Sequence, residues 1–263
     1  MKHLGPLGIR FLTHLFNLSV RKADLPAIWK SAHVIPILKP DKAADLAGSY
    51  RPVSLLCPEI KVLERLLLPK LSASLAPASS QHGFRKNHTT VSALLPVATR
   101  IAEGFNAPKP TVRTGLLCVD LSKAFDMVEH AALLDKIGGS SLHGNLKRWL
   151  VAYLRDRKIR CLFRGAYSRW RKLRVGVPQG SVSSPCLFNF FVNDISAASA
   201  PTNESYADDF HAAAQDVSPA VIANQLSAAA DKILTQASAH RMPLLPAKST
   251  VTLFMPWNQQ YGK

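Results

Sequence analysis

The sequence has few cysteines and no long apolar run. It contains 4 cysteines in 263 residues, none in a CxxC pair. Reduced thiols are therefore expected rather than a disulfide framework. No run approaches the roughly 18 consecutive apolar residues of a membrane-spanning helix. The first residues also lack the charged start, apolar segment and cleavage site of a secretory signal. These absences predict an intracellular protein that is not secreted and has no membrane partner.

Acidic residues are also scarce. Asp and Glu number 17 against 33 Lys and Arg, which gives a formal net charge of +16. A chain with this excess is expected to bind a polyanion, and nucleic acid is favoured over an anionic membrane. The 9 histidines are scattered without ligand spacing, so no zinc site is expected. With 47% hydrophobic residues, the chain should fold into one large domain or two subdomains.

Two of the few acidic residues, Asp208 and Asp209, are adjacent and lie between aromatic residues. The apolar run at 210–214 follows them, so the segment predicts the tip of a β-hairpin, where Asp tolerates tight-turn conformations. Adjacent carboxylates repel each other, and a hard cation such as Mg²⁺ would compensate their charge. Taken alone, such a pair is most often a solvated turn.

Asp120 is the candidate for a third carboxylate. It ends the apolar run at 116–119, a pattern typical of a buried strand that carries a carboxylate at its carboxyl end. If this strand neighbours the hairpin, Asp120 and Asp208 face one gap. Two Mg²⁺ ions roughly 3.5–4 Å apart would fit there, the arrangement of in-line phosphoryl transfer.

Segments in a fixed order carry a family resemblance. Residues 119–126, 176–185 (with the run Val-Pro-Gln-Gly-Ser) and 206–209 (Tyr-Ala-Asp-Asp) resemble the palm motifs of reverse transcriptases. Residues 49–55 (SYRPVSL) and 81–85 (QHGFR) resemble the fingers region of the enzymes of non-LTR, LINE-like retrotransposons. The resemblance extends over nearly the whole chain.

The resemblance implies an α+β right-hand polymerase fold. The fingers subdomain would occupy residues 1–115 and the palm residues 116–263, with an antiparallel palm sheet, helices packed on one face of it, and no thumb. The implied activity is RNA-directed DNA synthesis, in which dNTPs are added to a primer 3′-hydroxyl with two Mg²⁺ ions, or Mn²⁺ in their place. An RNA template and a DNA primer are the implied partners. A full-length protein would add endonuclease and thumb segments and act in the nucleus.

The resemblance also assigns roles to single residues. Asp120 and Asp208 would hold the metal ions, with Asp209 as a weaker third ligand. Lys248 would protonate the departing pyrophosphate, and Phe125 would pack under the sugar and exclude a 2′-hydroxyl. The residues that would contact the incoming nucleotide or border the template are Lys39, Arg51, Arg85, Gln179 and Gly180.

The segment 155–174 is dense in Arg and Lys and contains two strand-like runs, so it predicts a basic hairpin. Such a hairpin would neutralise several phosphates, and its interleaved aromatics, Tyr167 and Trp170, could stack on unpaired bases. The basic residues chosen as nucleic-acid ligands are Arg169, Arg171 and Lys172.

Two prolines carry structural expectations. Pro52 places the strand at 50–55 on a sheet edge, because proline cannot donate to a ladder. Pro69 should kink or end the helix predicted at 58–75.

Alternative functions remain open. The chain could be a catalytically inactive, truncated copy that only binds RNA, or a relative of group II intron maturases or telomerase. The sequence leaves open its activity as a fragment, its template RNA and its insertion target.

Overall fold

The computed structural model describes residues 4–198 and 203–256, and the chain divides into two compact units. One unit combines residues 1–76 with 128–187, and the other combines 77–127 with 188–263. Each unit is therefore built from two separate stretches of chain. This division is of a different kind from a single boundary at residue 115, and the expected extents of fingers and palm stay a prediction.

The first unit has a helical part with a buried apolar core. Its helices are α1 (Pro6–Lys22), α2 (Pro58–Ser74), α4 (His130–Gly138) and α5 (Gly144–Leu154), and α6 (Ser184–Ala198) begins in it. α5 buries an apolar face, since Trp149, Leu150 and Tyr153 are fully buried. The indole nitrogen of Trp149 also donates to Ser19 Oγ of α1 at 3.2 Å.

Pro69 was expected to kink or end the helix, and the second possibility was wrong, because α2 continues past Pro69 to Ser74. A proline removes one backbone donor, whose acceptor would be the carbonyl of Arg65, four residues earlier. Arg65 is exposed, so water can satisfy that carbonyl. Leu67 and Leu71, buried on either side of Pro69, hold the helix in place by packing.

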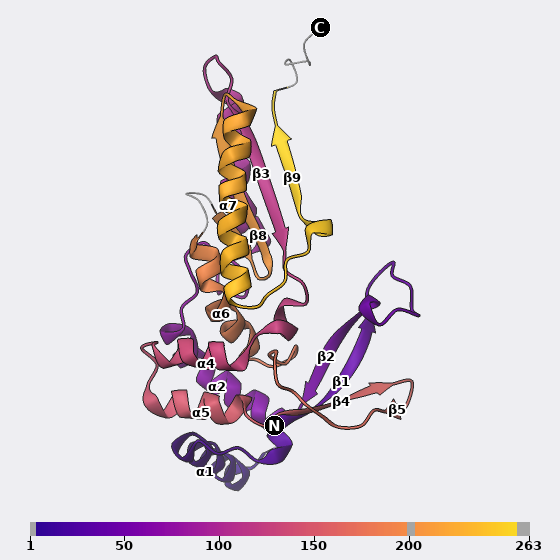
Figure 1. Ribbon diagram of the computed structural model, residues 1–263. Helices are drawn as coiled ribbons and strands as arrows, with labels where there is room; N and C mark the ends of the chain where they lie inside the picture. Colours follow the sequence, from indigo (N-terminus) through magenta and orange to yellow (C-terminus); the bar gives the residue numbers. More distant parts are fainter. Residues whose placement is uncertain (1–3, 199–202, 257–263) are drawn as a thin grey trace. The chain divides into compact units, whose positions relative to one another are not determined.

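The first unit also contains a sheet in the order β2-β1-β4-β5, with β6 paired to β4 (Figure 1). The strands are β1 (Ser31–Leu38), β2 (Tyr50–Leu56), β4 (Lys158–Phe163), β5 (Ala166–Tyr167) and β6 (Arg171–Lys172). β1 pairs antiparallel with β2 and parallel with β4. The edge position expected for Pro52 is confirmed, because β2 ends the sheet.

The second unit is built around an antiparallel sheet in the order β7-β8-β3-β9. Its strands are β3 (Arg113–Asp120), β7 (Asn203–Tyr206), β8 (Asp209–Asp216) and β9 (Thr250–Phe254). β3 is central, with β8 and β9 beside it (Figure 1). Asp120 at the end of β3 lies opposite Asp209 at the start of β8.

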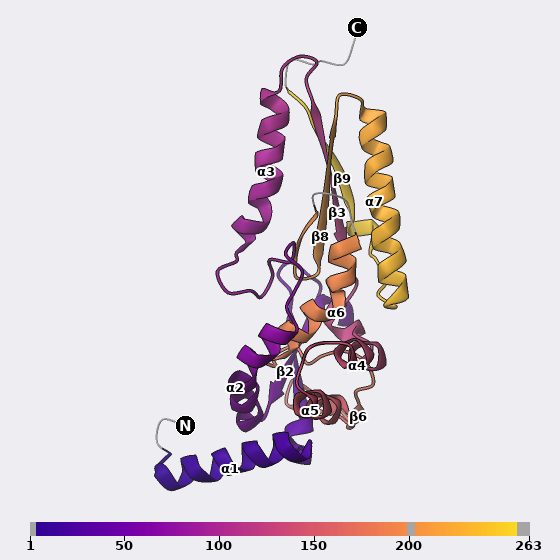
Figure 2. The same ribbon diagram turned by 90° about the vertical axis from the view of Figure 1, so that its left-hand side faces the viewer.

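Helices α3 (Thr90–Asn106) and α7 (Pro219–Ala239) pack on this sheet, and Figure 2 shows them on its two sides. Consecutive strand residues point to opposite faces. A Cβ on Gly115 would lie 2.4 Å from Ile222 of α7, and Thr114 Oγ1 would lie 3.0 Å from a Cβ on Gly104 of α3. The α+β class is confirmed, but α3 departs from the expected packing on one face, because Gly104 leaves room for the polar side of β3. None of the helices in the described ranges is long and apolar enough to cross a membrane.

Candidate active site

The predicted hairpin is present, and Asp208 lies in its two-residue turn. Tyr206 of β7 pairs with Asp209 of β8, which leaves Ala207 and Asp208 as the turn. Ala207 has φ +58°, a left-handed conformation that few residues other than Gly, Asn and Asp adopt readily. Something other than local preference must therefore hold this turn.

A buried glutamine holds the turn. Gln81 Nε2 donates to the carbonyl of Ala207 at 3.0 Å, and its Oε1 accepts from the backbone N–H groups of Ala207 and Gly83, both at 2.8 Å. A Cβ on Gly83 would lie 2.3 Å from the nitrogen of Ala207, so this position requires glycine. Asn189 Nδ2 of α6 in turn donates to the carbonyl of Gly83 at 2.7 Å. Sequence reasoning gave Gln81 no role, although the glycine two residues later was a signal of close backbone approach.

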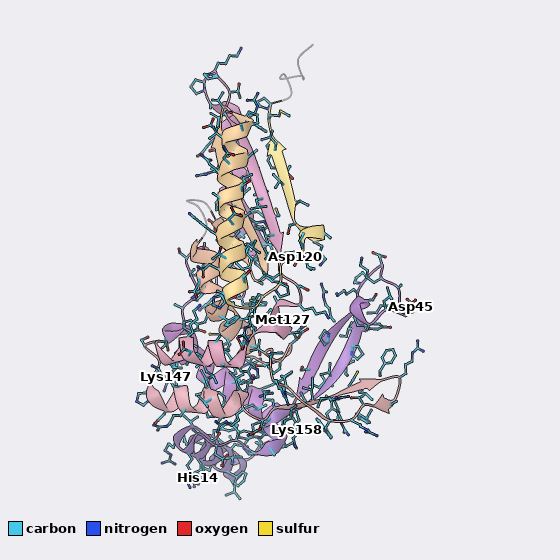
Figure 3. The ribbon with its side chains drawn as sticks, viewed as in Figure 1. His14, Asp45, Asp120, Met127, Lys147 and Lys158 are labelled. Carbon is cyan, nitrogen blue, oxygen red and sulfur yellow. The ribbon has the colours of Figure 1, made fainter. Side chains whose placement is uncertain are left out.

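Asp120 is the last residue of β3, where Figure 3 labels it. As expected, β3 and the hairpin strand β8 are neighbours. Their register places Asp120 opposite Asp209, and Asp208 immediately precedes Asp209. Lys248 Nζ lies 2.8 Å from Asp120 Oδ2. This lysine ends the short 3₁₀ helix η4 (Pro246–Lys248), which is held in place because the N–H of Leu245 donates to the carbonyl of Asp120 at 2.9 Å.

The electrostatics match a site with excess negative charge. Burial raises the pKa of Asp208, and the charges of Asp209 and Asp120 raise it further. The pKa of Asp209 is also raised, first by burial and then by the charge of Asp120. The hydrogen bond to Asp120 raises the pKa of Lys248, so its ammonium is protonated at neutral pH. The neighbouring carboxylates thus repel Asp208 and Asp209, and a cation beside them would lower the free energy of the ionised forms.

These residues fit a divalent cation by the chemistry of their donors. In the parts of the chain that the structure describes, no three His, Cys, Asp or Glu side chains already surround one ion position. The Lys248 ammonium itself supplies the positive charge beside Asp120. Its side chain is 65% exposed and therefore free to move, whereas the carboxylates are fixed by the sheet and the turn. Carboxylate oxygens on a rigid backbone are the ligands that hard divalent ions prefer.

Phe125 lies in the 3₁₀ helix η3 (Ala124–Met127), which follows β3. Its ring stacks on Phe188 of α6 with centroids 4.4 Å apart, and it meets Phe84 edge-on at 5.8 Å. Phe188 is fully buried, whereas Phe84 is 55% exposed. Phe125 is half-buried, and its ring is held in place by the stacked Phe188 and the edge-on Phe84.

The loop that carries Gln179 and Gly180 lies against β2 in the first unit. The N–H of Ser54 donates to the carbonyl of Gln179 at 2.6 Å. Gly180 has φ +122°, and a Cβ there would lie 2.5 Å from the carbonyl oxygen of Ser54. The close approach and the backbone conformation each require glycine at this position.

A buried carboxylate, Glu64 of α2, fastens the same loop. It accepts from Val182 N at 2.6 Å, Ser181 Oγ at 3.0 Å and Tyr153 Oη at 2.6 Å. Glu64 and Tyr153 are fully buried. Burial raises the pKa of Tyr153 far above its ordinary value, and the charge of Glu64 adds to this, so the phenol remains a donor. Sequence reasoning missed Glu64, although it lies on the apolar stripe of its helix, where a carboxylate is unusual.

Lys39 and Arg51 flank the loop between β1 and β2. Lys39 Nζ donates to the carbonyl of Gly48 at 3.0 Å. Arg51 is exposed on β2, opposite Ile37 of β1. Both cations therefore lie at the same end of the β1–β2 pair.

The predicted nucleic-acid ligands fall into two kinds. Arg85 in the second unit donates through Nη1 to the carbonyls of Ala78 at 3.0 Å and Gln81 at 2.9 Å, which is a structural role. Arg169, Arg171 and Lys172 in the first unit are exposed, and Lys172 lies 3.5 Å from the carboxylate of Asp156.

The structure brings four of the predicted residues together in the second unit, namely Asp120, Asp208, Asp209 and Lys248. Phe125 and Arg85 belong to the same unit. The remaining predicted residues lie in the first unit: Lys39, Arg51, Arg169, Arg171, Lys172, Gln179 and Gly180.

Comparison with known proteins gives consistent relatives. The family described as reverse transcriptase (RNA-dependent DNA polymerase) matches residues 37–261. A probable RNA-directed DNA polymerase from transposon BS of Drosophila melanogaster is 33% identical over 202 residues, covering 74% of this chain and 22% of that protein. The RNA-directed DNA polymerase from mobile element jockey of Drosophila funebris is 33% identical over 214 residues, covering 77% and 23%. The chain thus spans under a quarter of the length of these relatives.

Solved structures agree on the fold. An apo telomerase from Candida tropicalis has a TM-score of 0.62 at 12% identity, covering 92% of this chain and 49% of that one. A telomerase from the same organism with a fragment of telomeric RNA gives 0.60, also at 12% identity, covering 93% and 44%. At this identity the likeness concerns the fold alone, and it confirms the α+β polymerase architecture. The expected resemblance to non-LTR retrotransposon enzymes is likewise confirmed, and the chain belongs to the reverse transcriptase (RNA-dependent DNA polymerase) family.

Proposed function

We propose that this chain is the polymerase part of a non-LTR retrotransposon protein and extends a DNA primer on an RNA template. The observation that carries the proposal is the pairing of Asp120 with Asp209 across two central strands, with Asp208 in the adjacent turn. In a chain with a net charge of +16, three carboxylates where β3 ends and β8 begins concentrate negative charge where a reaction needs cations.

Divalent ions are expected of the family, and Asp120 and Asp208 would hold them, with Asp209 as a weaker third ligand. Two Mg²⁺ ions, or Mn²⁺ in their place, would activate the primer 3′-hydroxyl and neutralise charge on the leaving pyrophosphate. The chain's own contribution is to fix the ligands before the ions arrive. The Gln81 clamp sets the turn, and the β3–β8 ladder sets the opposing carboxylates.

The raised pKa of Lys248 keeps its ammonium protonated while it is paired with Asp120. Its exposed side chain would then leave Asp120 and donate the proton to the departing pyrophosphate. Lys39 and Arg51 would grip the triphosphate, since Arg presents a planar fork and Lys a mobile charge. The half-buried Phe125 would pack under the sugar and exclude a ribose 2′-hydroxyl. Gln179 and Gly180 would border the template, and Arg85 would contact it beside its structural role.

The carboxylate-bearing second unit would act as palm, and the unit with Lys39 and Arg51 would act in the fingers. RNA template, DNA primer and dNTPs are the proposed substrates. In the longer protein, endonuclease and thumb segments would complete the machinery, and a nuclear site of action would follow from integration into DNA.

Primer extension on an RNA template with Mg²⁺ and dNTPs tests the proposal. Asp208→Asn should lower the rate by about 10²–10³-fold or more, the range seen when one charge-stabilising group is removed. The matched control is Asp216→Asn at the far end of β8, where Asn can still accept the hydrogen bond from Ser218 N. Normal extension by Asp208→Asn would overturn the assignment.

A second candidate function is RNA binding without catalysis, favoured by the exposed basic residues of the β4–β6 hairpin. Affinity for primer–template with no Mg²⁺-dependent extension by the unsubstituted chain would select it. A maturase-like or telomerase-like activity is the weaker alternative, since the transposon polymerases share 33% identity with the chain and the telomerases 12%.

A further inference from the structure

A cluster of aromatic rings around one guanidinium lies on the sheet of the first unit. Arg160 of β4 places its Cζ 4.0 Å from the ring centroid of Tyr167 and 4.7 Å from that of Trp170. His33 of β1 is the register partner of Arg160 and lies 3.3 Å from its Nη2. The His33 ring also meets both aromatic rings edge-on, with centroids 5.3 and 5.7 Å away.

The hairpin that carries these rings has a defined geometry. Leu162 pairs with Tyr167, and the turn residues Arg164 and Gly165 have φ values of +48° and +80°. Positive φ at both positions is typical of the tight turn that matches strand twist. Ser168 fixes the return strand, because its N–H donates to the carbonyl of Cys161 and its Oγ accepts from Cys161 N–H, both at 2.9 Å. The rings therefore sit on a rigid support.

Both rings remain accessible although Arg160 covers part of each. Tyr167 is 52% exposed and Trp170 is 43% exposed. Two large rings exposed around one guanidinium form an apolar patch with a polar rim, which is typical of an interaction site. The contacts of Arg160 and His33 with Tyr167 and Trp170 restrict the rotamers of both rings before a ligand binds.

The surroundings select the ligand's charge. Acidic residues are absent from 155–174 apart from Asp156, which lies beside Lys172. The exposed cations of this segment are Arg155, Lys158, Arg164, Arg169, Arg171, Lys172 and Arg174. Exposed rings surrounded by cations suit a chain of phosphates that carries flat, unpaired bases. A duplex would satisfy only the cations, because its bases are already stacked.

We propose that Tyr167 and Trp170, held by Arg160 and His33, form a stacking platform for unpaired bases of single-stranded RNA, without sequence preference. The choice of RNA rests on the proposed function, whereas the platform itself does not. One face of the sheet carries four of these side chains by their register, namely Arg160, His33, Ile37 and Arg51. Arg51 lies four residues further along the strand pair than His33, or about 13 Å. An RNA strand bound on the platform would thus cover the same face as Arg51.

Binding of a fluorescein-labelled twelve-nucleotide oligouridylate, measured by anisotropy without Mg²⁺ or dNTP, tests the platform. Trp170→Leu keeps an apolar side chain against Arg160 but removes stacking, and should weaken binding by about 5- to 150-fold. Trp170→Phe should stay within about 3-fold of the unsubstituted chain, because a smaller ring still stacks. The matched control is Phe11→Leu, which alters a ring of α1 that is 66% exposed.

Equal affinity of Trp170→Leu and Trp170→Phe would overturn the platform, as would an equal loss with Phe11→Leu. An equal loss of affinity for duplex RNA would also overturn it, since only charge would then be involved. Tighter binding of oligodeoxythymidylate than of oligouridylate would overturn the choice of RNA. Asp208→Asn should bind oligouridylate normally, so failure of the polymerase proposal and failure of the platform give different results.

Discussion

Among residues outside the carboxylate site, Glu64 is expected to contribute most to the stability of the fold. Glu64→Ala removes the acceptor of Tyr153 Oη, Ser181 Oγ and Val182 N in a fully buried environment. Each buried donor left without an acceptor costs about 1–3 kcal/mol, and because Tyr153 Oη can still bond to Ser181 Oγ, the expected total is about 3–5 kcal/mol. Glu64→Gln keeps the shape but replaces one acceptor oxygen by a donor, which leaves one buried partner unsatisfied at about 1–3 kcal/mol.

These costs convert into measurable changes. In a domain of this size, 1 kcal/mol shifts the melting temperature by roughly 2–4 °C, so Glu64→Ala should melt about 6–20 °C lower and Glu64→Gln about 2–12 °C lower. Ser181 lies two residues after Gln179 and also accepts from the N–H groups of Ser183 and Ser184 at the start of α6. A loop displaced by 1 Å can lose up to about 100-fold in rate, so kcat/KM for primer extension should fall by about 10-fold or more in Glu64→Gln.

Circular dichroism would follow both thermal and urea unfolding, and primer extension would be measured under conditions where each variant is folded. Glu103→Gln, the same change at an exposed position of α3, is the control and should stay within about 0.5 kcal/mol. Tyr153→Phe and Ser181→Ala should be non-additive, because both hydroxyls share one carboxylate. An unfolding free energy of Glu64→Gln within 0.5 kcal/mol of the unsubstituted chain would refute the reasoning.

Three further predictions concern other parts of the chain. Gly180→Ala places a Cβ 2.5 Å from the carbonyl oxygen of Ser54 at φ +122° and should cost about 1–3 kcal/mol in urea unfolding. Burial lowers the pKa of His130 below its ordinary value of 6.5, so the unfolded chain protonates first as the pH falls. The stability that His130 contributes is therefore present above about pH 6.5 and is lost as the pH falls below it, by at most about 1.4 kcal/mol per pH unit. His130→Gln should flatten this slope between about pH 7.5 and 5.5. Mg²⁺ at ten times its dissociation constant should stabilise the chain by about 1.4 kcal/mol in a thermal melt, and Asp208→Asn should abolish the effect.

The elements of the second unit could be predicted because their signals are local. An apolar run that ends in Asp120 and an aspartate pair before another apolar run identify β3 and the β7–β8 hairpin. The pairing of the two strands could be expected from the shared chemistry of their ends. The register could not, since a shift by one residue would have preserved the same pattern while turning Asp120 away from Asp209.

The positioning residues escaped prediction for a different reason. Gln81 lies 126 residues from Ala207, and Glu64 lies 118 residues from Val182. A buried polar side chain is explained only by its partner, and no local period predicts a partner at that distance. The same holds for Pro69, whose effect on α2 was decided by buried leucines rather than by its own missing donor.

The buried side chains of Gln81 and Glu64 support the predicted site in the same way. Each is fully buried, each accepts from a backbone N–H group of a distant segment, and each thereby holds a loop in place. Gln81 does so at the left-handed Ala207 beside Asp208, and Glu64 does so just after Gly180. Strained backbone persists only where its surroundings over-determine it. Gln81 and Glu64 therefore hold the aspartate turn and the glycine loop in place. Substituting the aspartates alone would test the reaction, whereas substituting Gln81 or Glu64 would test what positions the reacting groups.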